Sequence, residues 1–376
     1  MAKKITYDSD IGNKETENLL EELEKKIRRE YTQATKELEE KAKDYLERFE
    51  KKDSIRLEYL EKRREKYENG EISFAELRKD QEEYKQWRIG QIAVGKRWEE
   101  MRDTMSEDLT ETYSKARGMI EGYMPEVYAL NHNYTTFQVE SQSKVNTSYT
   151  LYDAKTVERL VKENPRLLPN YRFGSVTYER MRDKNLRWNQ QNITSAITQG
   201  ILQGESIPKI AERLRNAGYM EYKASIRDAR TSVTCAQNAG RIEAMHRAED
   251  LGIHQKKQWL ATIDDRTRHE HRELDGEREE IDEPFKVEGY EIMYPTDPSA
   301  DPEMVYNCRC TMVTVFDGFD KKITDFDIDE RLGDMSYEEW KESRESESDP
   351  IDKQEREAEA MRRKYNEDYR RMNDYG

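Results

Sequence analysis

An apolar stripe runs through the first long segment of this sequence. Between residues 18 and 67 apolar side chains recur at steps of three and four, and Glu and Lys fill most of the other positions. This period places the apolar side chains on one face of an α-helix, so the pattern predicts a single long amphipathic helix over residues 18–67. The steps lean toward four, which does not encode a regular left-handed coiled coil. The stripe includes Leu19, Leu23, Ile27, Tyr31, Leu38 and Phe49.

A turn ends this helix, and a second helix follows it. Asn-Gly at positions 69–70 breaks the pattern, and Ser73 with Glu76 forms a capping box that starts the next helix at Phe74. We expect the second helix to continue to residue 120, with a kink in the glycine-containing stretch 90–95. Two long helices joined by a short turn are expected to fold back on each other as a hairpin.

The predicted hairpin has two interpretations. One is a spacer or oligomerisation arm. The other is a docking arm for a larger partner, because two helices cannot bury all of their large apolar side chains against each other, and exposed apolar surface marks interfaces. The candidate docking residues are Trp87, Trp98, Met101 and Met105.

Composition favours thin helical elements over thick layered domains. Hydrophobic residues make up 34% of the 376 positions and charged residues 39%, which suits solvated helices with narrow apolar stripes. A net charge of -15 opposes attraction of the whole protein to nucleic acid but allows a local basic face. Three Cys suit a reducing compartment. The sequence shows neither a signal peptide nor an apolar run long enough for a membrane span, so we expect no membrane partner.

The expected fold class is mainly α, with a small C-terminal α+β module. The irregular connector is rich in Asn, Thr, Ser and Tyr; it holds His132, expected to be an ordinary surface residue, and a short helix at 154–163. The predicted divisions are a long helical hairpin arm at 1–130, the connector at 131–174, a helical block plus the α+β module at 175–316, and an acidic, partly helical or disordered tail at 317–376.

Three helices are predicted in the central block. A polar helix covers residues 175–202, and Ser206 caps a short helix that Gly218 stops. The third helix covers residues 221–248 and carries small side chains that would allow close approach of a neighbour. Cys235 lies beside them and is expected to fill space in the core. The small residues are Ala229, Ser232, Ala236 and Gly240.

The α+β module is expected to pair two strands. One strand covers residues 256–262 with Trp259 pointing inward, and the other covers 310–316 and pairs near Trp259. Between them, Asp264 or Asp265 is expected to cap a short helix through Leu274, after which Asp275 and Gly276 form a turn.

His and Cys residues gather in this module. Cys308 and Cys310 with His271 offer the soft donor set of a zinc site, which would tie the short helix to the second strand. Paired Cys in structural zinc sites usually have two to four residues between them, so one intervening residue is a rarer geometry. The alternative is that the two Cys point to opposite sides of a strand, as a period of two requires, with Asn307 and Arg309 in a turn.

Charged residues around His271 allow further interpretations. Arg266, Arg268 and Arg272 could bind a phosphate or a partner carboxylate, but internal pairing with neighbouring Asp and Glu is the expected outcome. A metal-dependent hydrolase or nuclease centred on His271 is a further alternative. His269 and His271 point to different sides of a helix, so they would not bind one metal from it.

Five ordered motifs resemble those of the bacteriophage head-morphogenesis family, the minor head proteins similar to protein F of phage Mu. They are GILQGESIPKIAERL, the Arg-Thr of ASIRDARTSVTCAQNAGR, W-x-A-T-x-D-D-R-T-R-x-x-H-R-x-L-D-G, N-C-R-C and MSYEEW. The resemblance covers residues 175–316 and the last motif. This chain has Val305 and Tyr306 where the family often has Pro or His before N-C-R-C. The motif falls on Trp259, Asp265, Arg266, Arg268, His271, Leu274, Asp275, Gly276, Asn307, Cys308, Arg309 and Cys310.

The resemblance implies a structural, non-enzymatic role in the virion. Members are minor components associated with the portal protein, at the vertex through which DNA passes. The chain is accordingly expected at the portal vertex or head interior after assembly in the host cytoplasm, assisting procapsid assembly, DNA packaging or DNA delivery. Expected partners are the portal protein and, as further candidates, scaffolding or major capsid protein and viral DNA. An internal DNA-contacting protein is the alternative function, and zinc is the one cofactor considered.

Overall fold

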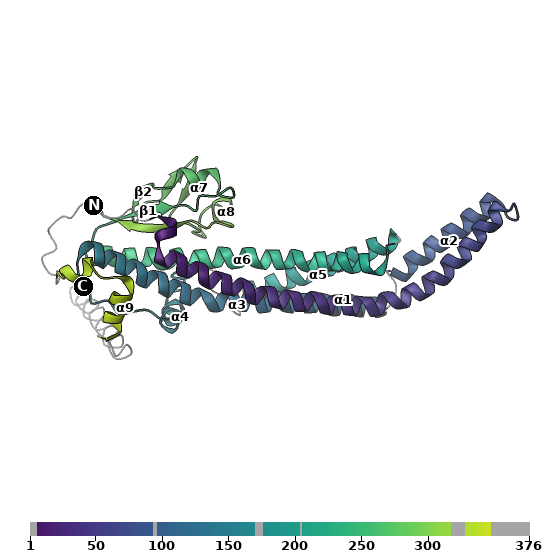
Figure 1. Ribbon diagram of the computed structural model, residues 1–376, viewed down its shortest axis with the longest axis horizontal. Helices are drawn as coiled ribbons and strands as arrows, with labels where there is room; N and C mark the ends of the chain where they lie inside the picture. Colours follow the sequence, from purple (N-terminus) through teal and green to yellow (C-terminus); the bar gives the residue numbers. More distant parts are fainter. Residues whose placement is uncertain (1–5, 93–95, 170–175, 204, 317–327, 347–376) are drawn as a thin grey trace, which may run out of the picture. The chain divides into compact units, whose positions relative to one another are not determined.

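The computed structural model describes residues 6–92, 96–169, 176–203, 205–316 and 328–346 (Figure 1). Helices dominate these residues and a small group of strands follows them, which confirms the mainly α fold class. The helices are α1 (Ile11–Glu68), α2 (Phe74–Ile92), α3 (Lys96–Ser143), α4 (Ala154–Glu163), α5 (Val176–Leu202), α6 (Ile207–Asp250), α7 (His269–Glu273), α8 (Pro302–Val305) and α9 (Tyr337–Ser346), with 3-10 helices at Tyr7–Ser9 and Glu330–Gly333.

The chain forms two compact units. Unit 1 consists of Met1–Glu21, Glu121–Tyr171 and Arg230–Gly376, and unit 2 consists of Glu22–Ile120 and Arg172–Ala229. Helices α1, α3 and α6 each contribute residues to both units. Both units are therefore assembled from segments distant in sequence, and the four divisions expected from the sequence stay a prediction.

The hairpin forms between α1 and α2 in unit 2. Gly70 adopts a positive φ of 77° in the turn, and Ser73 exchanges hydrogen bonds with Glu76, whose backbone N lies 3.3 Å from the Ser73 Oγ, confirming the capping box. Antiparallel contact brings the Phe49 and Trp87 rings within 5.9 Å. The long helix begins at Ile11, earlier than predicted, and α2 ends at Ile92. Gly95, part of the predicted kink, lies outside the described residues.

The core of unit 2 joins four helices. Apolar side chains of α1 and α3 pack against those of α5 and α6, so the apolar stripe of the first helix is covered by later parts of the same unit. Full burial of a Leu, Ile or Met side chain contributes roughly 1.5–3 kcal/mol to the free energy of unfolding. The buried cluster consists of Ala34, Leu38, Ala42, Leu46, Met105, Leu109, Ile193, Ala196, Ile197, Ile201, Ile210 and Leu214.

Two glycines lie within the continuous helix α6. The prediction that Gly218 stops a short helix is wrong, because α6 runs from Ile207 to Asp250. A Cβ at Gly218 would lie 2.8 Å from the Oγ1 of Thr35, so this glycine serves close packing instead. Gly240 confirms the predicted close approach, since a Cβ there would lie 2.4 Å from the carbonyl oxygen of Tyr128. Cys235 is buried, as expected.

The first part of the irregular connector predicted at 131–174 is helical, over residues 131–143. Helix α3 continues through Pro125 to Ser143, and His132, expected on the surface, is fully buried. Its Nδ1 lies 2.8 Å from the Tyr149 hydroxyl, and its ring stacks on Tyr152 at 4.3 Å. The low helix propensity of this stretch is overridden because its polar side chains are largely buried, and Asn131, Asn133 and Thr136 are hydrogen-bonded. The short helix at Ala154–Glu163 is confirmed, with Asp153 as its cap.

Five short strands form the β part of unit 1. One sheet has the order β2-β1-β5 (Arg278–Glu280, Lys256–Leu260, Thr311–Val315), and a second pairs β3 with β4 (Phe285–Val287, Tyr290–Ile292). Strands β1 and β5 are antiparallel, with Trp259 opposite Met312. The predicted pairing near Trp259 and the inward position of its side chain are therefore confirmed.

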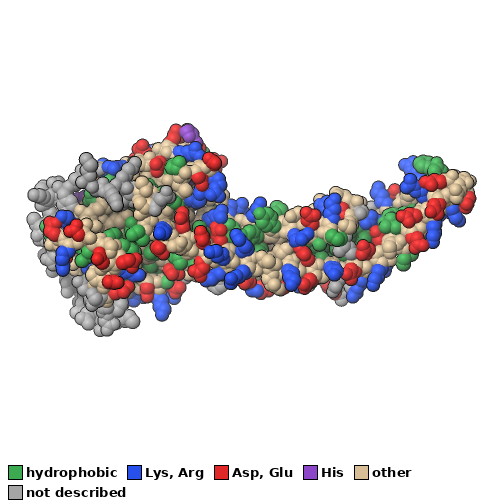
Figure 2. Space-filling model, viewed as in Figure 1, with side chains coloured by type: hydrophobic (Ala, Val, Ile, Leu, Met, Phe, Trp, Pro, Cys, Tyr) green, Lys and Arg blue, Asp and Glu red, His purple; other side chains and the backbone are tan. Residues whose placement is uncertain are grey.

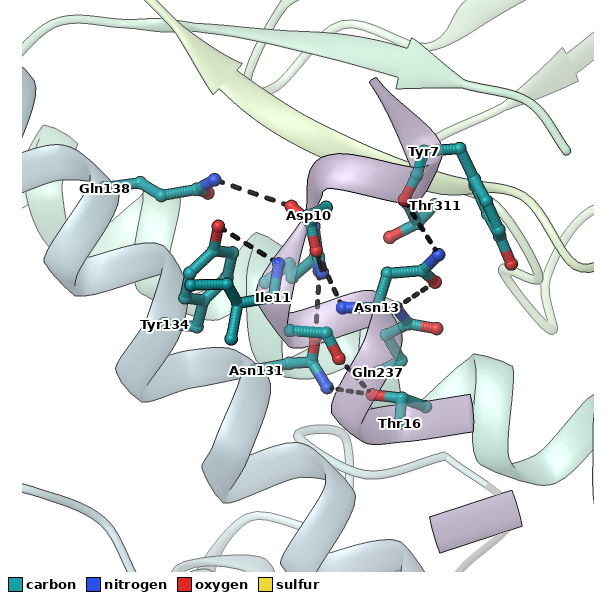
Figure 3. Close-up of polar contacts among 12 residues, drawn as sticks. Tyr7, Asp10, Ile11, Asn13, Thr16, Asn131, Tyr134, Gln138, Gln237 and Thr311 are labelled. Carbon is teal, nitrogen blue, oxygen red and sulfur yellow. Dashed lines mark hydrogen bonds and ion pairs between the residues drawn. The ribbon is translucent and has the colours of Figure 1, made fainter. Parts of the chain in front are cut away.

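Residues 7–16 make polar contacts with later segments of unit 1 (Figure 3). Asp10 caps α1 by accepting from the Asn13 backbone N at 2.7 Å, and it accepts two hydrogen bonds from Arg241 of α6, at 2.5 and 3.2 Å. Arg241 also donates to the Asn131 side chain and to the Met312 carbonyl. Arg241 and Asp10 are both fully buried, and paired, hydrogen-bonded charges of this kind are costly to separate.

Part of the acidic tail is folded. Of the two predicted alternatives for the tail, partly helical or disordered, residues 328–346 follow the first, because α9 forms there and buries Tyr337 and Trp340. The Trp340 indole and the Arg344 guanidinium both donate to Glu140 Oε2 of α3, each at 2.7 Å. The last predicted helix, at 350–369, lies outside the described residues.

Replacing Arg241 with Met should lower the free energy of unfolding by about 3–5 kcal/mol, because Asp10 would remain as a buried charge without its partner. Urea denaturation followed by circular dichroism measures this loss. Adding Asp10→Asn keeps the helix cap but removes the charge, so the double variant should recover part of the loss. A double variant no more stable than Arg241→Met would contradict the explanation.

Burial lowers the pKa of His132 from 6.5 to about 3. Below pH 6.5 the unfolded chain therefore binds a proton that the folded chain excludes. The stability that the neutral, buried imidazole contributes is lost as the pH falls from 6.5 toward 3. His132→Phe keeps the stacking but cannot titrate. The stability advantage of the wild type over this variant should shrink by about 1–2 kcal/mol between pH 7 and pH 5. An advantage that stays constant in urea titrations at both pH values would refute the assignment.

Candidate functional site

The motif residues converge in the β part of unit 1. Trp259 of β1 is buried, with its ring edge-on to His271 of α7 and to Phe285, at centroid distances of 5.6 and 5.3 Å. Leu274, Met304 and both Cys of the Cys-x-Cys pair complete this buried cluster. A small apolar core therefore surrounds His271 and the two thiols.

Cys308 and Cys310 point to the same place. Their Sγ atoms lie 3.5 and 3.4 Å from the Nδ1 of His271, and all three side chains are buried. The alternative that the two Cys face opposite sides of a strand is wrong, because β5 begins only at Thr311. Before it, Asn307 adopts a left-handed φ of 58°, so the period of two does not apply to this segment.

The pKa values of the two thiols are shifted in opposite directions. Burial raises the pKa of Cys308, whereas the hydrogen bond with Cys308 and the neighbouring His271 lower the pKa of Cys310. The backbone N of Cys310 donates to the Cys308 Sγ at 3.4 Å. From α6, Asn238 donates to the Cys310 carbonyl at 3.1 Å and accepts from the Thr311 hydroxyl. Two sulfurs and one imidazole nitrogen are donors that suit a soft divalent metal.

Asp264 organises the arginines beside this cluster. Its side chain accepts from Arg309 at 2.6 Å, and this guanidinium holds the pKa of the Asp264 carboxyl well below its usual range. Arg266 pairs with the same carboxyl, Arg272 donates to the Asp264 carbonyl, and Arg268 donates to the Tyr306 carbonyl. Internal pairing with a neighbouring carboxylate is confirmed for Arg266, whereas Arg268 and Arg272 bond to backbone carbonyls.

The expected cap at Asp264 or Asp265 is wrong, since α7 begins at His269 with Arg268 in the cap position. Asp264 instead closes a tight turn by accepting from the backbone N of Arg266. Asp265 is exposed.

His269 and His271 lie on different sides of α7, as predicted. His271 is buried, while His269 is exposed within reach of Glu273 and Glu288. Such a surface group is commonly an ordinary ion pair. The hydrolase alternative centred on His271 therefore gains no second histidine from this helix.

The turn residues of the motif support the sheet. Asp275 accepts from the backbone N of Ala261 at 2.9 Å, and Gly276 donates to the Trp259 carbonyl at 2.9 Å. Gly276 has a φ of 87°, which favours glycine. The predicted turn is therefore confirmed, and its role is to hold β1.

The four candidate docking residues belong to unit 2 and are far from uniform in exposure. Met105 is fully buried and Met101 partly buried in the four-helix core. Trp87 is half-buried, stacked on Phe49 and covered by Arg56. The Trp98 side chain lies outside the described residues. Two of the four thus serve the internal packing of the unit.

Sequence reasoning missed Asp10, Arg241 and Asn238. Arg241 follows the small-residue face of α6 directly, and a single arginine beside an otherwise apolar run is the one signal that points to it. Asp10 carries no such signal, because its partner lies 231 residues away.

Comparisons with known proteins bear on the family. The model of the Phage Mu protein F like protein family matches residues 191–313. Minor head protein GP7 of Bacillus phage SPP1 is 27% identical over 307 residues, covering 79% of this chain and 87% of that protein. An NAD(+)-arginine ADP-ribosyltransferase, EFV, of Enterococcus faecalis is 36% identical over 151 residues, covering 40% of this chain and 31% of that protein. No solved structure matches.

The protein is thus a helical scaffold with a small β part, in which His271, Cys308 and Cys310 lie together. Together the matched family model and the SPP1 protein support the assignment of this chain to the phage minor head protein family. The matched residues 191–313 contain His271, Cys308 and Cys310. Among the described residues, no helix is long and apolar enough to cross a membrane.

Asn307 offers a test of how the Cys segment is shaped. Because Asn307 has a left-handed φ of 58°, Asn307→Val should lower the free energy of unfolding by about 1–2 kcal/mol, while Asn307→Gly should stay within about 0.5 kcal/mol of the wild type. Thermal and urea denaturation of both variants measure this. Equal effects of Gly and Val would show that the backbone conformation is not what selects Asn.

Proposed function

We propose that this chain is a minor head protein that docks on the portal vertex and assists procapsid assembly, DNA packaging or DNA delivery. The observation that carries the proposal is the match to the minor head protein of phage SPP1, which extends over 87% of that relative's length. The role is structural. The transferase named among the relatives is covered by this chain over 31% of its length, and its activity is that protein's own.

The α1–α2 hairpin supports a docking role. Hydrophobic side chains gather where α1 gives way to α2 (Figure 2): Phe74 is 61% exposed and Tyr67 40%, and their rings lie 5.9 Å apart. Along α1, Ile55, Leu57 and Tyr59 are exposed as well. Large apolar side chains grouped on one element are typical of an interface.

Charge distribution favours a protein partner over DNA. On the face shown in Figure 2, basic and acidic side chains are interspersed along the helices. Basic residues of α1 pair with acidic residues of the same helix, as in Lys62 with Glu58 and Arg64 with Glu68. DNA binding depends on a coherent basic field that releases counterions. We therefore place the portal protein ahead of viral DNA as the partner, with scaffolding or major capsid protein as further candidates.

Coexpression of the full chain with the portal protein of the same phage tests this proposal. Tyr67→Glu with Phe74→Glu should reduce the amount of copurified portal protein at least tenfold, because buried interface aromatics carry much of the binding energy. Both side chains are exposed, so the variant should unfold at the temperature of the wild type.

Tyr306→Ser is the matched control, since Tyr306 is 57% exposed in unit 1. It should copurify the portal protein as the wild type does. A wild-type chain that brings down no portal protein would overturn the docking proposal. Loss in the Tyr306 variant with retention in the hairpin variant would move the docking surface to unit 1.

A further inference from the structure

We propose that His271, Cys308 and Cys310 bind one Zn²⁺ ion that fastens α7 to the start of β5. Two thiolates and an imidazole are the donors that zinc prefers in structural sites. They are also the one group of buried His, Cys, Asp or Glu side chains, among the residues that the structure describes, with ligand atoms all within 4.8 Å of one another.

The spacing of the donor atoms fits tetrahedral zinc. With a Zn–S distance of about 2.3 Å and a Zn–N distance of about 2.0–2.1 Å, the edge of the tetrahedron between sulfur and nitrogen is roughly 3.6 Å. The Nδ1 of His271 lies 3.5 Å from the Cys308 Sγ and 3.4 Å from the Cys310 Sγ. Both distances match this edge, so a metal could bind with little movement of His271 relative to either sulfur.

A backbone hydrogen bond orients one of the two sulfurs. The N–H of Cys310 donates to the Cys308 Sγ at 3.4 Å. Donors aimed at ligand atoms orient them and stabilise their negative charge when a metal binds. A cysteine that merely fills space in the core, like Cys235, would not require such bonds.

The bonds among the three groups are poor substitutes for a metal. A thiol is a weak donor and a weak acceptor, yet the imidazole Nδ1 faces two sulfurs in a site where all three side chains are about 2% exposed. Buried polar groups are normally satisfied by strong partners. A Cys308–Cys310 disulfide would leave that nitrogen with no good partner, whereas zinc satisfies all three atoms together.

A structural role suits the position of the site. His271 is 37 residues from Cys308 and 39 from Cys310 in the sequence, and the strands around it are three to five residues long. A metal that joins distant segments of such a small module contributes its binding free energy to folding. The described residues supply three donors, so the fourth position falls to a water molecule or to a donor outside them.

Elemental analysis of the purified full chain, by inductively coupled plasma mass spectrometry, tests the proposal. We expect about one zinc per wild-type chain, as one closed site would hold. Cys308→Ser and His271→Ala should each lower the zinc content at least fivefold. The matched controls are Cys235→Ser, which alters a buried Cys outside the cluster, and His269→Ala, which alters the neighbouring histidine. Both controls should keep their zinc.

Cobalt substitution keeps the test decisive where a ligand variant fails to fold. Wild-type protein stripped with a chelator and loaded with Co²⁺ should show the visible bands of tetrahedral cobalt and a thiolate-to-cobalt charge-transfer band. Chelation should also lower the unfolding temperature, with recovery on adding Zn²⁺. A wild-type chain that contains no zinc and takes up no cobalt, or a mass that shows a Cys308–Cys310 disulfide, would overturn the proposal.

Discussion

The buried ion pair between Arg241 and Asp10 holds unit 1 together. The guanidinium bonds to the carboxylate at the start of α1, to the Asn131 side chain of α3 and to the Met312 carbonyl of β5. One side chain of α6 thus contacts three other elements. Two charges removed from water are costly, and this cost is offset only where every donor finds an acceptor. The arrangement therefore stabilises one packing of these elements over alternatives.

The His/Cys cluster depends on the same framework. Asn238, one turn before Arg241 on α6, bonds to the Cys310 carbonyl and to Thr311, while Arg241 bonds to Met312. The first residues of β5 are thus fixed from the helix side. The neighbouring strand β1 is held by the turn that follows α7, where Asp275 bonds to Ala261 and Gly276 bonds to Trp259. The positions of the cysteines are consequently set by hydrogen bonds that hold the adjacent backbone, independently of the bonds that the thiols make.

Periodicity in the sequence predicted most of the helices, because apolar stripes and the Ser73–Glu76 capping box act locally. Local rules misled where tertiary contacts decide the outcome. Gly218 resembles a helix stop, yet it lies within α6, where Thr35 leaves no room for a Cβ. The stretch after Pro125 resembles a loop, yet buried hydrogen bonds such as that of His132 keep it helical. Neither Thr35 nor Tyr149 is identifiable as a partner from one sequence.

The candidate site was predictable in its residues but not in its shape. The motif pointed to His271, Cys308 and Cys310, and all three meet in the structure. The expectation that the cysteines diverge assumed a regular strand through both. A single left-handed residue, Asn307, and a late start of β5 at Thr311 invalidate that assumption. The backbone conformation of a single residue depends on the residues packed around it, and the sequence pattern does not reveal that conformation.

The order of segments in the two units has a consequence for synthesis of the chain. Unit 2 is inserted into unit 1, since Glu22–Ile120 and Arg172–Ala229 both lie between Met1–Glu21 and Arg230–Gly376. A ribosome that has released residue 229 has supplied every residue of unit 2. In unit 1, by contrast, Asp10 can form its ion pair only after Arg241 has been synthesised. Glu140 can bond to Trp340 only after a further 200 residues have been added to the chain. Unit 2 can therefore fold before the synthesis of unit 1 is complete. Unit 1 folds last, because it needs its C-terminal residues.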